Sequence, residues 1–251
     1  MKHIKKIIDT FEPISLAEMD EVKLLDRTDT KYMFNIKALP DILMRASEHY
    51  RVLDINNIRI NSYETLYFDT KGLSLYNEHH NGKLNRYKIR YRCYKDSNLS
   101  FFEIKHSTNK NRTVKQRIKK KNIEEEITGD AGDFLLAKTH LLPENFTAKL
   151  WVYYSRITLV NKTSKERLTI DLNLSFKEGD KIVKFPKLVI AELKQDKAGK
   201  SFFTELMKDC NIRTMSISKY CFGIINIYEN VKKNNFKMKL QHFNKIYNDK
   251  N

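Results

Sequence analysis

Residues 86–94 read RYKIRYRCY, a stretch in which cationic side chains alternate with aromatic or apolar ones. Successive side chains of a β-strand point to opposite faces, so this alternation predicts a strand with one cationic face. Arg86, Lys88, Arg90 and Arg92 would lie together on that face. Four like charges repel one another, so either water solvates them on an outer surface or an anionic ligand compensates them. The stretch alone leaves both interpretations open.

The composition favours a folded protein with an anionic partner. The chain has 251 residues and a formal net charge of +16, and its pI is near 9.6. This charge suits nucleic acid, a membrane surface, a nucleotide or polyphosphate as the partner. Three cysteines without a CxxC motif indicate neither a disulfide framework nor a zinc site. Because no apolar run resembles a secretory signal or a membrane span, we expect a cytoplasmic protein.

The order of the predicted elements defines a fold class. Glycine and proline are scarce and no linker divides the chain, so we expect one domain over residues 1–251. Strands are expected at 30–36, 63–69, 86–94, 99–106, 113–118, 151–159, 166–172 and 188–194. Helices are expected at 16–25, from Pro40 onward, at 129–142, at 200–210, and at the C-terminus from about 218. Mostly sequential strands predict an α+β fold, with an antiparallel sheet or closed barrel and helices packed outside.

Other predicted strands present charged side chains with the same alternation. The set comprises Glu103 and Lys105, Lys115 and Arg117, Arg156, Arg167 and Asp171, Glu192 and Lys194, and Arg27 and Lys31 at the entry to the first strand. If the opposite faces pack under helices, these polar faces line the concave side of a curved sheet. Buried cations need partners, and a phosphate chain supplies them. Arginine suits bidentate phosphate contacts, and Glu192 is a hard-oxygen ligand suited to Mg²⁺ or Mn²⁺.

An ordered series of short motifs resembles a known family. The series is RTDTKY, YFDT, KIRYR, FFEIKH, VKQR, YSRITL, RLTIDL, IAELK and SISKY, and it runs from Arg27 to Tyr220. It resembles the vacuolar transporter chaperone (VTC) domain, the polyphosphate polymerase branch of the CYTH-like triphosphate tunnel metalloenzymes. The resemblance implies a closed antiparallel barrel, or tunnel. It also implies transfer of the ATP γ-phosphoryl group to a growing polyphosphate chain, with release of ADP.

The same resemblance implies roles for individual residues. Residues expected to contact the reacting phosphates are Arg90, Arg92, Lys105, Arg156 and Lys219. Residues expected to bind the nucleotide or guide the polymer are Lys31, Lys88, Lys115, Arg117 and Ser218. Glu192 matches the metal-binding glutamate and would hold Mn²⁺ or Mg²⁺. ATP and inorganic polyphosphate are the expected partners, and export of a polymer would need a separate membrane protein.

One departure from the family pattern bears on the alternative functions. The E-x-E-x-K signature of the hydrolytic relatives is replaced by DRTDTKY, which disfavours triphosphatase or cyclase chemistry without excluding it. A metal-dependent triphosphatase is therefore the first alternative, and a non-catalytic polyphosphate- or RNA-binding module is the second. The basic run 110–121 supports RNA binding, although a solvated hairpin explains it better. Nucleic acid is not the expected partner, and His79-His80 is interpreted as a loop pair.

Overall fold

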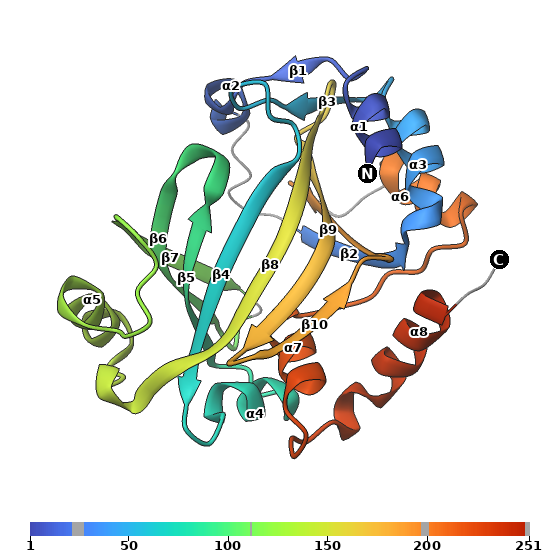
Figure 1. The fold of residues 1–251 in the computed structure, drawn as a ribbon. Helices are drawn as coiled ribbons and strands as arrows, with labels where there is room; N and C mark the ends of the chain where they lie inside the picture. Colours follow the sequence, from blue (N-terminus) through green and yellow to red (C-terminus); the bar gives the residue numbers. More distant parts are fainter. Residues whose placement is uncertain (22–27, 111, 197–200, 249–251) are drawn as a thin grey trace.

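The computed structural model describes residues 1–21, 28–110, 112–196 and 201–248 (Figure 1). An antiparallel path of eight strands dominates the fold, and each pair of neighbours along it is antiparallel. In order across the sheet these are β2 (Thr28–Asn35), β11 (Leu188–Gln195), β9 (Glu166–Glu178), β8 (Phe146–Asn161), β4 (Asn61–Thr70), β5 (Arg86–Tyr94), β6 (Leu99–Ser107) and β7 (Thr113–Lys120). The predicted α+β class and all eight predicted strands are confirmed.

Three short strands extend this sheet, and none of them was predicted. β3 (Tyr50–Leu53) pairs antiparallel with β8 and parallel with β1 (Pro13–Ile14). β10 (Lys181–Phe185) forms a hairpin with β9. The predicted helix 16–25 is described as α2 (Leu16–Glu21), and its remaining residues lie outside the described part of the chain. None of the described helices is long and apolar enough to cross a membrane.

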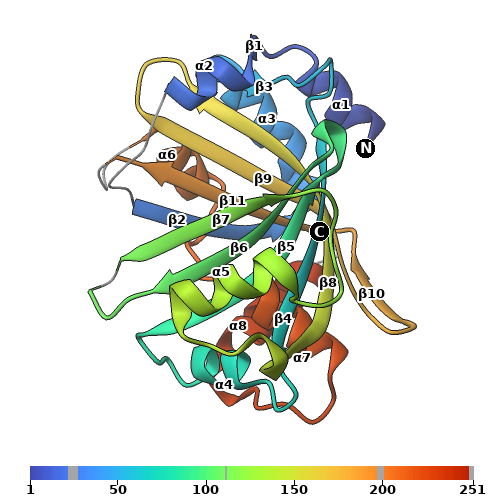
Figure 2. The ribbon, with the colours of Figure 1, turned by 90° about the vertical axis from the view of Figure 1, so that its left-hand side faces the viewer.

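The expected closure of the sheet into a barrel is wrong. β2 and β7 end the strand path, and no pairing between them occurs among the described residues. The outer edge of β2 is bonded instead to an irregular segment, in which Thr214 bridges Tyr32 and the Met215 N–H donates to the Lys31 carbonyl at 2.7 Å. This segment occupies backbone groups of β2 with which a closing strand would have to form hydrogen bonds. The sheet is therefore strongly curved but open (Figure 2).

Helices cover the convex face, as the strand pattern predicts. α1 (Lys2–Ile8), α3 (Leu39–Ala46) and α6 (Phe202–Asp209) pack on the outer side chains of β2, β11, β9 and β8. α5 (Gly129–Thr139) covers the outer side of β5 and β6, where Ile89 and Tyr91 are fully buried against Ala131 and Leu135. The apolar half of the RYKIRYRCY alternation therefore lies under a helix, and its cationic half faces the concave side.

One helix contradicts the expectation that all helices lie outside. α7 (Lys219–Ile227) packs against the concave face, where Leu150, Val152 and Phe176 present apolar side chains that need cover. Gly223 permits this approach: a Cβ there would overlap Leu150 and stand 2.5 Å from Phe176 Cδ1. α4 (Ser74–His80) and α8 (Lys237–Asn248) lie beside α7. The apolar end of the concave face is thus filled, and the polar end remains for a ligand.

Candidate functional site

Asp171 organises the first group of cations on the concave face. Arg156 of β8 lies directly opposite Asp171 of β9, and its guanidinium makes a bidentate contact at 2.6 and 2.9 Å. Lys219, the first residue of α7, contacts Oδ2 of the same carboxylate, the oxygen that also accepts from Arg156 Nη2. Burial would raise the pKa of Asp171, but the two cations lower it below its usual value. Asp171 therefore stays ionised and orients Arg156 and Lys219.

Glu103 organises a second group, and its carboxylate is almost completely buried. Arg90 of β5 contacts one oxygen through Nε at 2.8 Å and Nη2 at 2.7 Å, and Lys115 of β7 contacts the other at 2.5 Å. Arg90 also donates to the Tyr67 hydroxyl at 2.9 Å. Burial opposes ionisation of Glu103, but Arg90, Arg92 and Lys115 lower its pKa. Its oxygens already hold cations, so Glu103 acts here as a positioning group.

Glu192 lies on β11, and its side chain is on the concave face. Its carboxylate is 3.3 Å from Lys31 Nζ and 2.9 Å from Lys194 Nζ, and Lys194 also contacts Asp29 at 2.9 Å. Burial would raise the pKa of Glu192, whereas the two lysines lower it, so the carboxylate is ionised. The described residues contain no group of three or more His, Cys, Asp or Glu side chains suited to a metal ion. Glu192 is therefore not part of a preformed cluster of metal ligands within the described part of the chain.

Three of the predicted site residues are buried or half-buried cations without a carboxylate within ion-pair distance among the described residues: Lys88, Arg92 and Lys105. Lys88 donates to Ser218 Oγ at 3.1 Å, and Arg92 donates to Thr65 Oγ1 at 3.3 Å. Burial and the charges of Lys88 and Lys31 lower the pKa of Lys105 to about 7. Burial is the larger cause of this shift, and the charges of the neighbouring lysines add to it, so the protonated side chain would gain from an anionic ligand.

Tyrosine rings form the floor beneath these cations, and the sequence interpretation gave them no role in the site. The Arg156 guanidinium lies 5.1 Å from the Tyr63 ring centroid and 5.2 Å from that of Tyr154. The Tyr154 hydroxyl is buried without a hydrogen-bond partner in the described structure, and burial raises its pKa to about 12. Because Tyr154 is two residues before Arg156 on one strand, strand parity already placed it on this face.

The other predicted residues and the basic run have different surroundings. Arg117 is on the concave face of β7 but is exposed, 4.2 Å from the Phe101 ring centroid. Ser218 is the N-cap of α7. The basic run is not wholly solvated as interpreted, because the Lys120 side chain is only 10% exposed and its ammonium contacts Asp130 and Glu124. Arg27 lies outside the described residues.

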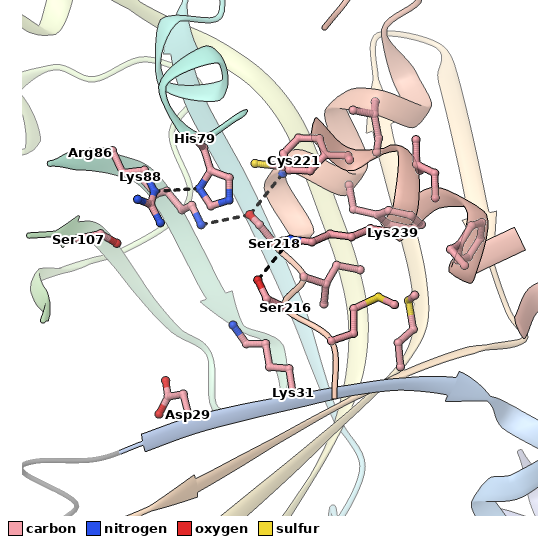
Figure 3. A pocket seen from close by; sticks show the side chains of 18 of the residues that line it. Asp29, Lys31, His79, Arg86, Lys88, Ser107, Ser216, Ser218, Cys221 and Lys239 are labelled. Carbon is pink, nitrogen blue, oxygen red and sulfur yellow. Dashed lines mark hydrogen bonds between the residues drawn. The ribbon is translucent and has the colours of Figure 1, made fainter. Parts of the chain in front are cut away.

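A cavity of about 240 Å³ adjoins the cationic face between β2, β5 and α7 (Figure 3). Lys31, Lys88 and Lys105 line one side of it. His79, interpreted as part of a loop, instead lies in the last turn of α4 and also lines the cavity. Its Nδ1 accepts from Arg86 Nε at 3.1 Å, and burial with the nearby Lys88 and Arg86 charges lowers its pKa to about 3. The imidazole is therefore neutral.

The fold and site define a class: a curved antiparallel sheet whose concave face carries more cations than carboxylates. The family model for the VTC domain matches residues 26–228, and the chain belongs to this family, which confirms the resemblance drawn from its motifs. A comparison with curated protein sequences found no match.

Solved structures share the fold at low identity. A proposed adenylate cyclase from Bacillus halodurans superposes with a TM-score of 0.51 at 12% identity, covering 81% of this chain and 98% of its own. A proposed adenylyl cyclase from Hippeastrum, described as having a dominant triphosphatase activity, gives a TM-score of 0.51 at 10% identity, covering 82% and 98%. At these identities the likeness establishes the fold alone.

Proposed function

We propose that the protein is a polyphosphate polymerase that transfers the γ-phosphoryl group of ATP to a polyphosphate chain and releases ADP. The observation that carries the proposal is the set of uncompensated cations Lys88, Arg92 and Lys105 beside the paired cations of the same face. Buried charges without partners are costly, and perturbed pKa values cluster at functional sites. A phosphate chain supplies the missing negative charge, and membership of the VTC domain family supports this ligand.

The reaction follows from charge neutralisation and positioning. A terminal phosphate oxygen of the acceptor attacks the γ-phosphorus, and the bond from that phosphorus to the β,γ-bridging oxygen breaks, so ADP leaves with the electron pair. Phosphoryl transfer needs little covalent chemistry from the protein. Arg90, Arg92, Arg156 and Lys219 would hold the triphosphate and the transferring group, with Lys105 beside them. Lys31, Lys88, Lys115, Arg117 and Ser218 would bind the remaining phosphates.

Asp171 and Glu103 would act through the cations that they hold. Each carboxylate fixes two cations in one geometry before the ligand arrives, which reduces the reorganisation that charge stabilisation would otherwise require. Neither oxygen pair is free for a metal in this arrangement. We therefore treat both as positioning residues and place the metal elsewhere.

Glu192 would hold Mn²⁺ or Mg²⁺. Its carboxylate and that of Asp29 both contact Lys194, so the two carboxylates lie near each other. Mg²⁺ is commonly bound by one or two carboxylates together with substrate phosphates and water. The Glu192 oxygens also contact lysines, but the contact with Lys31 is long at 3.3 Å, so a divalent ion that arrives with the nucleotide would displace this lysine and take its place on the carboxylate. When bound, the ion would neutralise charge on the phosphate oxygens.

A triphosphatase is the second candidate, because the fold matches that of the Hippeastrum protein described as having a dominant triphosphatase activity. Water would then replace the phosphate acceptor in the same site. Incubation of the purified protein with ATP and Mn²⁺, followed by gel resolution of the phosphate products, separates the two candidates. A ladder of polyphosphate with ADP supports the polymerase, whereas free phosphate with no polymer refutes it. Asp171→Asn serves as the control variant with a disrupted cation group.

A further inference from the structure

The cavity beside the cationic face has two chemically different sides. One side carries the ammonium groups of Lys31, Lys88 and Lys105. The other side is apolar and is formed by side chains from β2, the segment before α7, α7 and the C-terminal region: Met33, Met215, Ile217, Phe222, Leu240 and Phe243. Figure 3 shows Ser107 on one side of the view and Lys239 on the other, and between them Lys88 reaches Ser218 at the start of α7. A ligand suited to this space has an anionic end and an apolar end.

Part of the apolar side lies beyond the family match, which ends at residue 228. Phe236, Lys239, Leu240 and Phe243 all line the cavity and all belong to residues 229–248. The region is firmly packed: the Phe243 ring lies 4.9 Å from the Phe222 ring, centroid to centroid, and Asn35 Nδ2 donates to the Ile246 carbonyl at 3.0 Å. The apolar wall is therefore well packed against the rest of the fold.

The size of the cavity limits what it can hold. Its volume of about 240 Å³ is below the roughly 300–1,000 Å³ typical of pockets that enclose a drug-sized ligand. It therefore suits one flat fragment of a larger ligand whose phosphates lie on the cationic face. Polar groups are few at the apolar side. Lys239 Nζ donates to Ser216 Oγ at 3.5 Å, and neutral His79 carries its proton on Nε2, because Nδ1 accepts from Arg86.

We propose that this cavity binds the nucleoside end of a nucleoside triphosphate, and that residues 229–248 make the chain prefer a nucleotide to inorganic triphosphate. This inference rests on the proposed function, because the phosphates must lie on the cationic face. The base packs against the apolar wall formed by Leu240 and Phe243, and the phosphates extend past Lys88 toward Lys105. With few polar groups facing the base edge, the wall recognises apolar area and distinguishes purines poorly from one another.

The test compares two ligands on matched variants. Leu240→Trp fills the apolar side of the cavity, and Met238→Trp places the same side chain on the same helix at a position that is 77% exposed. Calorimetric titrations use a non-hydrolysable ATP analogue and inorganic triphosphate, both with Mn²⁺. We expect Leu240→Trp to weaken the analogue about tenfold, equivalent to ~1.4 kcal/mol, and to leave triphosphate binding within about twofold. Met238→Trp should bind both ligands as the parent protein does.

A second variant keeps the inference testable if Leu240→Trp fails to fold. Leu240→Ser keeps the cavity open but makes its wall polar, and it should also weaken the analogue selectively. Equal affinities of parent and variants for the analogue overturn the inference, as does an equal loss for both ligands. If the parent protein binds triphosphate but not the analogue, the inference fails while phosphate binding stands. If the parent binds neither ligand, the proposed function itself fails.

Discussion

Replacing Lys105 by methionine should stabilise the ligand-free protein at pH 6 while weakening its binding of inorganic triphosphate. Lys105 is a half-buried cation with no carboxylate partner among the described residues, and burial together with Lys88 and Lys31 lowers its pKa to about 7. Holding it protonated therefore costs free energy until an anion arrives. Methionine keeps the apolar length of the side chain and removes the charge.

The size and pH dependence of the effect follow from the pKa. A fall from 10.5 to about 7 corresponds to at most ~5 kcal/mol at about 1.36 kcal/mol per pKa unit, and solvent screening of a half-buried group reduces this to about 1–2 kcal/mol. Below pH 7 the lysine is protonated in both the folded and unfolded states, so the full cost is present. Between pH 7 and 10.5 only the unfolded state keeps the proton, so the stability of the parent protein rises with pH. The advantage of methionine should therefore shrink across that window.

Urea unfolding at pH 6 and pH 9, with and without triphosphate, measures both effects. Lys184→Met is the matched control, because Lys184 is an exposed lysine on β10, away from the concave face. We expect Lys105→Met alone to gain stability at pH 6, and triphosphate to stabilise the parent more than the variant. A variant that is less stable than the parent at pH 6, or that is stabilised equally by triphosphate, would refute this interpretation of Lys105.

Three further predictions concern single positions. Asp171→Asn leaves buried cations without a counter-charge, so it should lower the free energy of unfolding by about 3 kcal/mol in urea titrations, and saturating triphosphate should restore part of the loss. Gly223→Ala should destabilise the fold by about 2 kcal/mol, because its Cβ would overlap Leu150 in the concave core; Gly72→Ala, with no atom within 4 Å of its Cβ, should leave thermal unfolding nearly unchanged. Glu192→Gln should reduce metal-dependent turnover at least about tenfold and leave metal-free triphosphate binding intact; unaltered turnover would remove the metal assignment.

Strand parity predicted much of the sheet and of the site, because a period of two is visible within each strand. It placed Arg90 and Arg92 opposite Ile89 and Tyr91, as the structure has them. It could not say which carboxylate would hold which cation, because pairing depends on register between strands. The contact between Arg156 and Asp171 exists because these residues lie directly opposite each other on neighbouring strands. The sequence of one strand does not reveal which residue of the neighbouring strand lies opposite.

Strand parity could not predict that α7 packs against the concave face. Val152 and Phe176 are apolar on the concave face, and an alternating pattern does not say which face is concave. A β-bulge at Asn173, whose φ is 53°, also shifts the parity of β9 between Asp171 and Phe176. α4 was missed because it is only seven residues long. Its first turn is fixed by a contact with β4, in which the buried Asp69 carboxylate accepts hydrogen bonds from the backbone N–H groups of Leu75 and Tyr76.

The most direct test of the central claim follows the label from ATP into product. The purified protein is incubated with Mn²⁺ and ATP that carries ³²P in either the γ or the β position, and the products are resolved by chain length. Phosphoryl transfer to a phosphate acceptor predicts γ-label in a ladder of polyphosphate and β-label only in ADP. Release of all γ-label as free phosphate, with no ladder at any time, would contradict the account.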